Sequence, residues 1–325
     1  MSRIYFLLLL LCPVALCAQQ LPSASPLGID RFLFNPAMTA TERTASISVR
    51  YDQQWLGFAD APRTISAAGQ FALNNQPLGI GAFLMSDEFL PFQQQTIGMT
   101  YAYHLGGFSR SLSGSKRSFT GPRKQGQFSF GISVAYQQTS FQASSLTVTH
   151  GDDQLLPTGE GPTGGLAVGA GIYYASRPGG EKERSYGYFG VSARQLLADE
   201  LQPQDADADF AGLVGVSHAN LTVGYHGETE DYIFMPSLWI DIAENAPATT
   251  QFSFTAEKIN TYWAGLSYNI NQTMALQLGY IIAQPEGGNA LRVGAMGTFN
   301  LGSSVSDRGL GYAGYLAYVF GRNKL

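Results

Sequence analysis

The residues best suited to acid–base or metal chemistry are histidines and aspartates, and their spacing does not assemble a closed site. His150, Asp152 and Asp153 lie in one stretch and have the residue types of an aspartate–histidine protease centre. Such chemistry needs a second, facing group, which a single short stretch does not supply. The histidines also lack the close spacing of metal ligands; they are His104, His150, His218 and His226. The sequence therefore favours a protein that is not an enzyme.

A second acidic stretch, Asp205, Asp207 and Asp209, has the spacing with which a calcium-binding EF-hand loop begins. That loop needs a Gly and a bidentate Glu at positions where this chain has Phe210 and Val216. Weak binding of a surface cation stays open, but a dedicated metal site is not expected. No glycine-rich phosphate loop follows a strand and opens a helix, so we expect no nucleotide and no other cofactor.

The N-terminus has the parts of a secretory signal peptide. A short basic segment precedes the apolar residues 4–11, and residues 15–18 supply small side chains before a polar start. We therefore expect a signal peptide at residues 1–18, which would contain both cysteines of the chain, Cys12 and Cys17. The rest of the chain then has no thiol for a disulfide, a metal site or a nucleophile. The net charge of −5 does not suggest nucleic-acid binding.

The strongest structural signal is an alternation of large apolar residues with small or polar ones, which is the pattern of β-strands. Ile97, Met99 and Tyr101 share one face of such a segment, whereas Gly98 and Thr100 share the other. A soluble sandwich, the alternative all-β fold, would turn its large residues inward and its charged residues outward. Charged residues are only 13% of this chain, and the small face carries few of them. The pattern favours large residues toward lipid and small residues inside a narrow, filled lumen.

About fourteen segments show this alternation, and an even number suits a single-chain bacterial barrel. The sequence therefore predicts an all-β fold, a transmembrane antiparallel β-barrel of about 14 strands in the cell outer membrane. A leader or plug segment at residues 19–43 would precede the barrel, which would occupy residues 44–325. The expected strands lie near residues 44–55, 63–73, 77–86, 95–105, 127–139, 165–175, 186–196, 219–227, 231–242, 250–258, 261–270, 273–282, 290–301 and 311–320.

Short motifs set the beginning of the expected barrel apart from the rest of the chain. Pro36 fixes its own φ and restricts Asn35 to an extended conformation, while Gly57 gives backbone freedom next to the bulky Trp55. These residues could form a partner-docking or plug element, or a corner of the interfacial aromatic girdle. The motif residues are Asn35, Pro36 and Ala37, then Tyr51, Gln54, Trp55 and Gly57, and finally Pro62 and Thr64.

This combination of motifs resembles the opening of the PorP/SprF family of type IX secretion membrane proteins. Members of that family show Asn-Pro-Ala near the mature start, Tyr-Arg-x-Gln-Trp at a strand end and Pro-x-Thr at the next strand. In this chain Asp52 stands where the family carries Arg. The resemblance implies an outer-membrane barrel that acts as an accessory component of type IX protein secretion or gliding machinery. It would contact outer-membrane lipid and bind secretion components, or a cargo protein through its C-terminal sorting domain, without catalysis.

The rival interpretation is a FadL-like or porin-like passage for small solutes, since FadL-like barrels also have Asn-Pro-Ala near the start of their plug. A water-filled lumen would need charged residues along the inward faces of the strands. The sequence predicts that such inward charges are scarce, which disfavours an open pore.

The connection at residues 106–126 is basic, whereas the connection at residues 199–209 is acidic. With the N-terminus in the periplasm, the basic connection would fall on the periplasmic side and the acidic one outside. We hypothesise that the basic connection is an electrostatic docking site for a periplasmic partner; a solvated loop is the alternative. Its basic residues are Arg110, Lys116, Arg117, Arg123 and Lys124.

Overall fold

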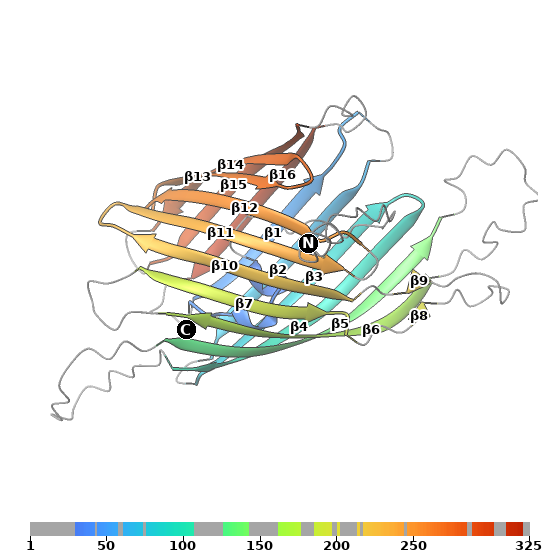
Figure 1. Cartoon of the computed structure of the whole chain (residues 1–325), viewed down its shortest axis with the longest axis horizontal. Coiled ribbons are helices and arrows are strands. Elements are labelled where there is room, and N and C mark those ends of the chain that lie inside the picture. Colours follow the sequence, from blue (N-terminus) through green and yellow to red (C-terminus); the bar gives the residue numbers. More distant parts are fainter. Residues whose placement is uncertain are drawn as a thin grey trace, which may run out of the picture.

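The chain forms a closed antiparallel barrel of fourteen strands, as the computed structural model in Figure 1 shows. Each barrel strand pairs with the next barrel strand along the chain, β7 with β10 included, and β1 closes the barrel by pairing with β16. A separate two-stranded sheet, β8 with β9, lies outside this order. The structure describes residues 30–42, 44–57, 61–73, 76–106, 126–142, 162–176, 185–196, 200–201, 213–214, 217–243, 246–284, 288–301 and 310–320.

The fourteen barrel strands confirm the fold class and follow the predicted segments closely. Their bounds are β1 Ala45–Gln53, β2 Arg63–Ala72, β3 Leu78–Phe89, β4 Phe92–Leu105, β5 Gln127–Phe141, β6 Pro162–Ala175, β7 Tyr186–Arg194, β10 His218–Glu228, β11 Tyr232–Ala243, β12 Thr249–Lys258, β13 Tyr262–Asn269, β14 Thr273–Ala283, β15 Ala290–Asn300 and β16 Gly311–Phe320. The short β8 Glu200–Leu201 and β9 Leu213–Val214 were not predicted.

The alternation places large apolar side chains on the outside of the barrel. On β4, Ile97 and Met99 are 57% and 61% exposed, whereas Thr100 and Ala102 are buried. A barrel in lipid needs this arrangement because its outer face contacts hydrocarbon chains and its backbone groups must all be paired within the wall. The described part of the chain contains no helix long and apolar enough to cross a membrane.

The barrel has two distinct ends. Ala45 of β1 pairs with Phe320 of β16 at one end, which we call the terminal end. Gln53 pairs with Tyr312 at the other, which we call the far end. Tight turns join strands at both ends; Asn260 and Gln272 adopt positive φ values of 57° and 67° in two of them.

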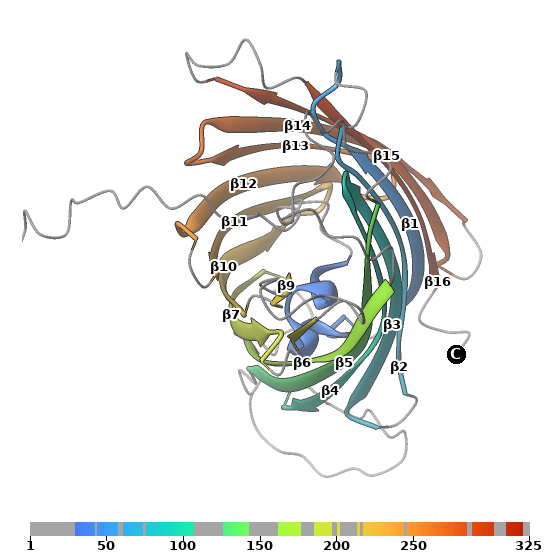
Figure 2. The same ribbon diagram turned by 90° about the vertical axis from the view of Figure 1, so that its right-hand side faces the viewer.

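The only helical turns among the described residues precede β1. They are the 3₁₀ turns η1 Arg31–Leu33 and η2 Pro36–Met38. Figure 2, which looks into the barrel, shows this dark-blue segment inside the ring of strands, close to β5, β6 and β7. The predicted signal peptide at residues 1–18 lies outside the described residues, and the predicted domain boundaries stay predictions.

Candidate functional site: a plug seated in the lumen

Residues 30–42, which we call the plug, fold locally around Asn35 and Pro36. The Asn35 side chain caps η2 by accepting a hydrogen bond from the Ala37 N–H, at 3.0 Å. Pro36 stands at the first position of the turn, where its missing N–H has no cost. The Thr39 hydroxyl closes the turn by donating to the Pro36 carbonyl, at 2.7 Å. Three of these residues, Asn35, Ala37 and Thr39, are completely buried.

Asn35 also fastens the plug to the wall. Its Nδ2 donates to the carbonyl of Ile172 on β6, at 3.1 Å, and to that of Val191 on β7, at 3.4 Å. Because Ile172 and Val191 face each other across the two strands, one amide group spans the β6–β7 ladder. A single Asn therefore caps the turn with its oxygen and anchors it with its nitrogen, which uses both halves of the amide.

Other plug residues contact strands far away in the sequence. The Thr39 hydroxyl lies 2.9 Å from that of Thr100 on β4, and the Ala40 N–H donates to Gln70 Oε1 on β2, at 2.8 Å. The Ser192 hydroxyl on β7 donates to the Phe34 carbonyl, at 2.7 Å. Together with the Asn35 contacts, these bonds join the plug to β2, β4, β6 and β7. Each such bond contributes about 1 kcal/mol net.

Glycines in the wall make room for the plug. A Cβ on Gly131 of β5 would lie 2.1 Å from the Ala37 nitrogen, and a Cβ on Gly171 of β6 would lie 2.1 Å from Asn35 Oδ1. Real Cβ atoms do not approach other atoms so closely, so only glycine permits this contact at either position. We call the inward faces of β4–β7 that meet the plug the plug seat.

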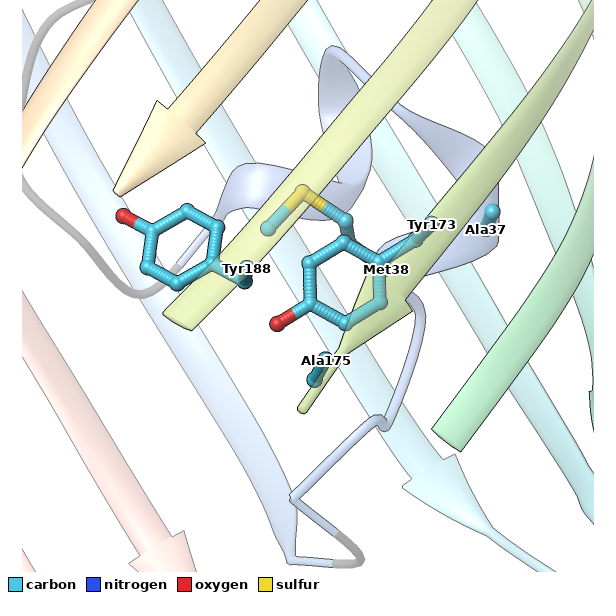
Figure 3. Packing of buried hydrophobic residues seen from close by; sticks show 5 residues of the cluster. All are labelled: Ala37, Met38, Tyr173, Ala175 and Tyr188. Carbon is cyan, nitrogen blue, oxygen red and sulfur yellow. The ribbon is translucent and has the colours of Figure 1, made fainter. Parts of the chain in front are cut away.

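An apolar cluster completes the plug seat. Met38 and Ala37 pack against Tyr173, Ala175 and Tyr188, and all five are buried. Figure 3 shows Met38 lying between the rings of Tyr173 and Tyr188 in this view, with Ala175 below. Burial of these side chains adds a hydrophobic contribution to the plug's hydrogen bonds.

The plug also carries charges into the lumen. The guanidinium carbon of Arg31 lies 5.3 Å from the centre of the Tyr188 ring, a cation–π contact. Asp30 accepts a hydrogen bond from the Ser48 hydroxyl of β1, at 2.8 Å. Burial raises the pKa of the Asp30 carboxyl, while the Ser48 hydrogen bond and the positive charge of Arg50 lower it. Burial is the larger influence, so the carboxyl holds its proton more tightly than in water.

The expected scarcity of inward charges is wrong. Arg292 of β15 is paired with Glu257 of β12, at 2.5 Å, and lies over the Trp263 ring, at 4.7 Å. Arg194 and His218 each lie 3.2 Å from a carboxylate oxygen of Asp241. These charges occupy inward positions of the alternation, and pairing offsets part of the cost of removing them from water. Arg50 and Asp52 form a further pair on β1.

The second group of predicted motif residues lies at the far end of the barrel. The Gln54 N–H donates to the Pro62 carbonyl, at 2.9 Å, which closes the β1–β2 connection. Tyr51 and Tyr312 both donate to Gln53 Oε1, at 3.0 Å. Thr64 donates to Asp87, at 2.5 Å. We call this region, with Gly57 at a φ of 113°, the rim corner.

Trp55 is a large exposed residue of the rim corner. Its side chain is 45% exposed, and its φ of 52° is a left-handed conformation that few non-glycine residues adopt. Backbone strain of this kind costs about 1–3 kcal/mol and is concentrated at functional positions. Leu56 beside it donates its N–H to the Leu310 carbonyl, at 2.7 Å, and so ties the rim corner to the chain entering β16.

The family of this chain follows from a family model. The model described as the type IX secretion system membrane protein PorP/SprF matches residues 16–311. The protein belongs to the PorP/SprF family. This confirms the resemblance seen in its opening motifs, and a search of curated proteins gives no match.

Solved structures support the fold of this PorP/SprF barrel. The toluene transporter TodX of Pseudomonas putida aligns with a TM-score of 0.51 at 10% identity, over 90% of this chain and 93% of that one. A FadL homologue of Pseudomonas aeruginosa aligns with a TM-score of 0.52 at 11% identity, over 90% of this chain and 94% of that one. At such identities the likeness concerns the fold alone. Fold and family together place the PorP/SprF protein in the outer membrane.

The predicted motif residues of this PorP/SprF protein separate into two places. The middle of the plug is formed by Asn35, Pro36 and Ala37. The other motif residues lie in the rim corner. The glycines of the plug seat and the Glu257–Arg292 pair were not predicted. Their position in the alternation could have indicated them, since each lies on the face of its segment that carries small or polar residues.

Several predicted features lie outside the described residues. They include the basic residues Arg110, Lys116, Arg117, Arg123 and Lys124, the acidic stretch from Asp205 to Asp209, and His150 with its neighbouring aspartates. Among the residues that the structure does describe, no three His, Cys, Asp or Glu side chains gather as metal ligands would.

Proposed function

We propose that this barrel is a non-enzymatic accessory component of type IX protein secretion or gliding machinery. On this proposal it binds secreted surface cargo, through the cargo's C-terminal sorting domain, or periplasmic subunits of the machinery. Family membership supports the role in type IX secretion. The observation that supports binding over an open pore is the plug, which is held in the lumen by Asn35, by further hydrogen bonds to the wall and by the glycines of the plug seat.

Binding would then use surfaces at the two ends of the barrel. The rim corner offers Trp55, whose large amphipathic ring is of the type enriched in protein interfaces. The basic connection at residues 106–126 offers five positive charges for an acidic periplasmic partner. Both surfaces are held by a rigid barrel, as binding loops often are.

The direct test is the display of cargo on cells. Deletion of the gene should remove from the cell surface one or more proteins that carry a C-terminal sorting domain, and the wild-type chain should restore them. A surface proteome that is unchanged by the deletion would contradict a secretion role. Replacing the five basic residues by Gln should weaken capture of periplasmic subunits without affecting barrel assembly.

Passage of a small solute is the second candidate function. Its support is the polar inward face of β12–β15, where the Glu257–Arg292 pair lies across the barrel from the plug seat. Single-channel recording in a planar bilayer separates the two functions. Steady conductance by the intact barrel would favour passage, and silence would favour binding.

A further inference from the structure

Two neighbouring polar side chains of the lumen wall are buried without a hydrogen-bond partner. They are Asn220 and Thr222 of β10, which are 2% and 0% exposed. Within the described part of the chain, both amide atoms of Asn220 and the hydroxyl of Thr222 are unpaired, and all three atoms are closed off from solvent. Buried polar groups in proteins are nearly always paired, so these two side chains need a physical explanation.

The plug residue Phe34 lies over the row of the wall that contains Asn220. In the strand register Asn220 stands between Ser192 of β7 and Asp241 of β11. The Ser192 hydroxyl donates to the Phe34 carbonyl, at 2.7 Å. From β7, Arg194 reaches across β10 to Asp241, at 3.2 Å, and its guanidinium carbon lies 5.2 Å from the centre of the Phe34 ring. Both neighbours of Asn220 are therefore tied to Phe34, which closes the space above β10 (Figure 2).

The plug also covers the next row, which contains Thr222. Thr222 stands between Gly190 of β7 and Trp239 of β11. The Phe34 ring meets the Trp239 ring edge-on, with ring centres 5.9 Å apart. On the other side, a Cβ on Gly190 would lie 2.8 Å from the Thr222 methyl group and 2.9 Å from Asn35 Nδ2. Because a phenyl ring offers neither a conventional donor nor an acceptor, Phe34 covers β10 without pairing its polar groups.

The docked plug therefore has contacts of opposite sign. Its hydrogen bonds join it to β2, β4, β6 and β7, whereas Asn220 and Thr222, which we call the covered pair, receive none. Leaving a buried donor or acceptor unpaired costs free energy of the same order as one hydrogen bond contributes. When the plug is released, the covered pair faces the lumen, where water pairs it. The docked plug is thus stabilised by its bonds and destabilised by the groups beneath Phe34.

We propose that Phe34 is a cover over a polar site on β10, and that burial of the covered pair sets the docked plug close to release. Docking closes the site at the cost of three unpaired polar atoms, and release returns those atoms to water in the lumen. The covered pair therefore biases a two-state plug toward its released state. This inference concerns the barrel alone and does not depend on the proposed role in secretion.

One chemical change, made at two places in the lumen, tests the inference. Thr222→Val removes an unpaired hydroxyl from beneath the plug and keeps the shape of the side chain. Thr100→Val makes the same change on β4, where the hydroxyl is paired with that of Thr39 in the plug, at 2.9 Å. Thr222→Ser keeps the unpaired hydroxyl and serves as the conservative variant. Each full-length barrel is purified in detergent, and tryptic cleavage after Arg31 is followed by mass spectrometry, since cleavage reports the released plug.

The two Thr→Val variants should change cleavage in opposite directions. Thr222→Val should slow it about fivefold, because docking no longer buries an unpaired hydroxyl, and Thr100→Val should speed it about fivefold, because docking loses a hydrogen bond. Thr222→Ser should be cleaved no more slowly than the wild type. Asn220→Leu, which removes two unpaired atoms at similar volume, should slow cleavage about tenfold.

Three results would overturn the inference. Cleavage of Thr222→Val at the wild-type rate or faster would show that this hydroxyl is paired while the plug is docked. Slowing by Thr222→Ser equal to that by Thr222→Val would show that the hydroxyl is not the cause. A wild-type plug that is never cleaved after Arg31, while Thr100→Val is not cleaved either, would show that the plug is not close to release. If Thr222→Val fails to assemble, Asn220→Leu decides by the same criterion.

Discussion

The two walls of the lumen carry different inward-facing residues. The plug seat on β4–β7 is lined by small residues such as Gly131 and Gly171, and a segment of the chain lies against it. The wall on β12–β15 instead carries Trp263 and the Glu257–Arg292 pair. Even there a glycine makes room, because a Cβ on Gly279 would lie 2.0 Å from the Trp263 ring. Close packing therefore decides which residues each wall can carry.

The largest expected effect belongs to the charged wall. Glu257→Ala leaves the half-buried Arg292 without its acid, which should lower the free energy of unfolding by about 3 kcal/mol. The control is Glu88→Ala, which removes the acid from the more exposed Arg63 and should cost at most about 1 kcal/mol. Thermal unfolding in detergent measures both. Equal losses would show that the lumen does not shield the Glu257–Arg292 pair from water.

The next effect concerns the plug seat. Gly131→Ala places a Cβ against the Ala37 backbone, and overpacking of this kind should weaken plug docking by about 2 kcal/mol. Tryptic cleavage after Arg31 should become faster while the barrel stays folded. Gly297→Ala on β15 is the control, because nothing lies within 4 Å of its added Cβ. An unchanged cleavage rate in Gly131→Ala would show that plug docking does not need a glycine at this position.

A substitution of Asn35 tests the hydrogen bonds that hold the plug, rather than the glycines of the plug seat. Asn35→Ala removes the cap of η2 and both hydrogen bonds to the β6–β7 ladder, so docking should weaken by about 1–2 kcal/mol. The same cleavage assay applies, since cleavage follows the population of the released plug when release is fast. Asn271→Ala, in an exposed turn, should have no effect. A cleavage rate in Asn35→Ala equal to that control would show that the amide does not hold the plug.

The smallest expected effect is a pH dependence of plug docking. Because burial raises the pKa of Asp30, the docked plug binds its proton more tightly than the released plug does. Docking is therefore strongest below the usual carboxyl pKa of about 3.9 and weakens as the pH rises through the raised value. Asp30→Asn should slow plug release more at pH 8 than at pH 4. Hydrogen exchange of the plug amides measures this; the same ratio at both pH values would refute it.

The strands could be predicted because the alternation that indicates each strand lies within that strand. The outward positions of Ile97, Met99 and Tyr101 and the inward position of Thr100 follow from local alternation, which lipid on one side imposes. The motif Asn35-Pro36-Ala37 could be singled out, but its seat could not. Asn35 bonds to Ile172 and Val191, which are 137 and 156 residues away, and nothing in the local pattern encodes that pairing.

The same reasoning explains the remaining differences. The inward charges were not predicted because a charged residue on a small-residue face can be interpreted only when its partner on another strand is known. Glu257 and Arg292 are such a pair. The predicted strand at residues 186–196 ends earlier, at Arg194, and Gln195 after it adopts a left-handed φ of 56°, a conformation that the residue type glutamine does not indicate. Tertiary contacts decided each of these features.

Co-purification from native outer membranes tests the central claim most directly. The full-length barrel is extracted in mild detergent, and its companions are identified by mass spectrometry, with the Trp55→Ala variant alongside. The account predicts type IX secretion subunits, or a surface protein with a C-terminal sorting domain, and less of it with Trp55→Ala if the rim corner takes part. A barrel that is recovered alone, while its fold and plug are intact, would contradict an accessory role in secretion.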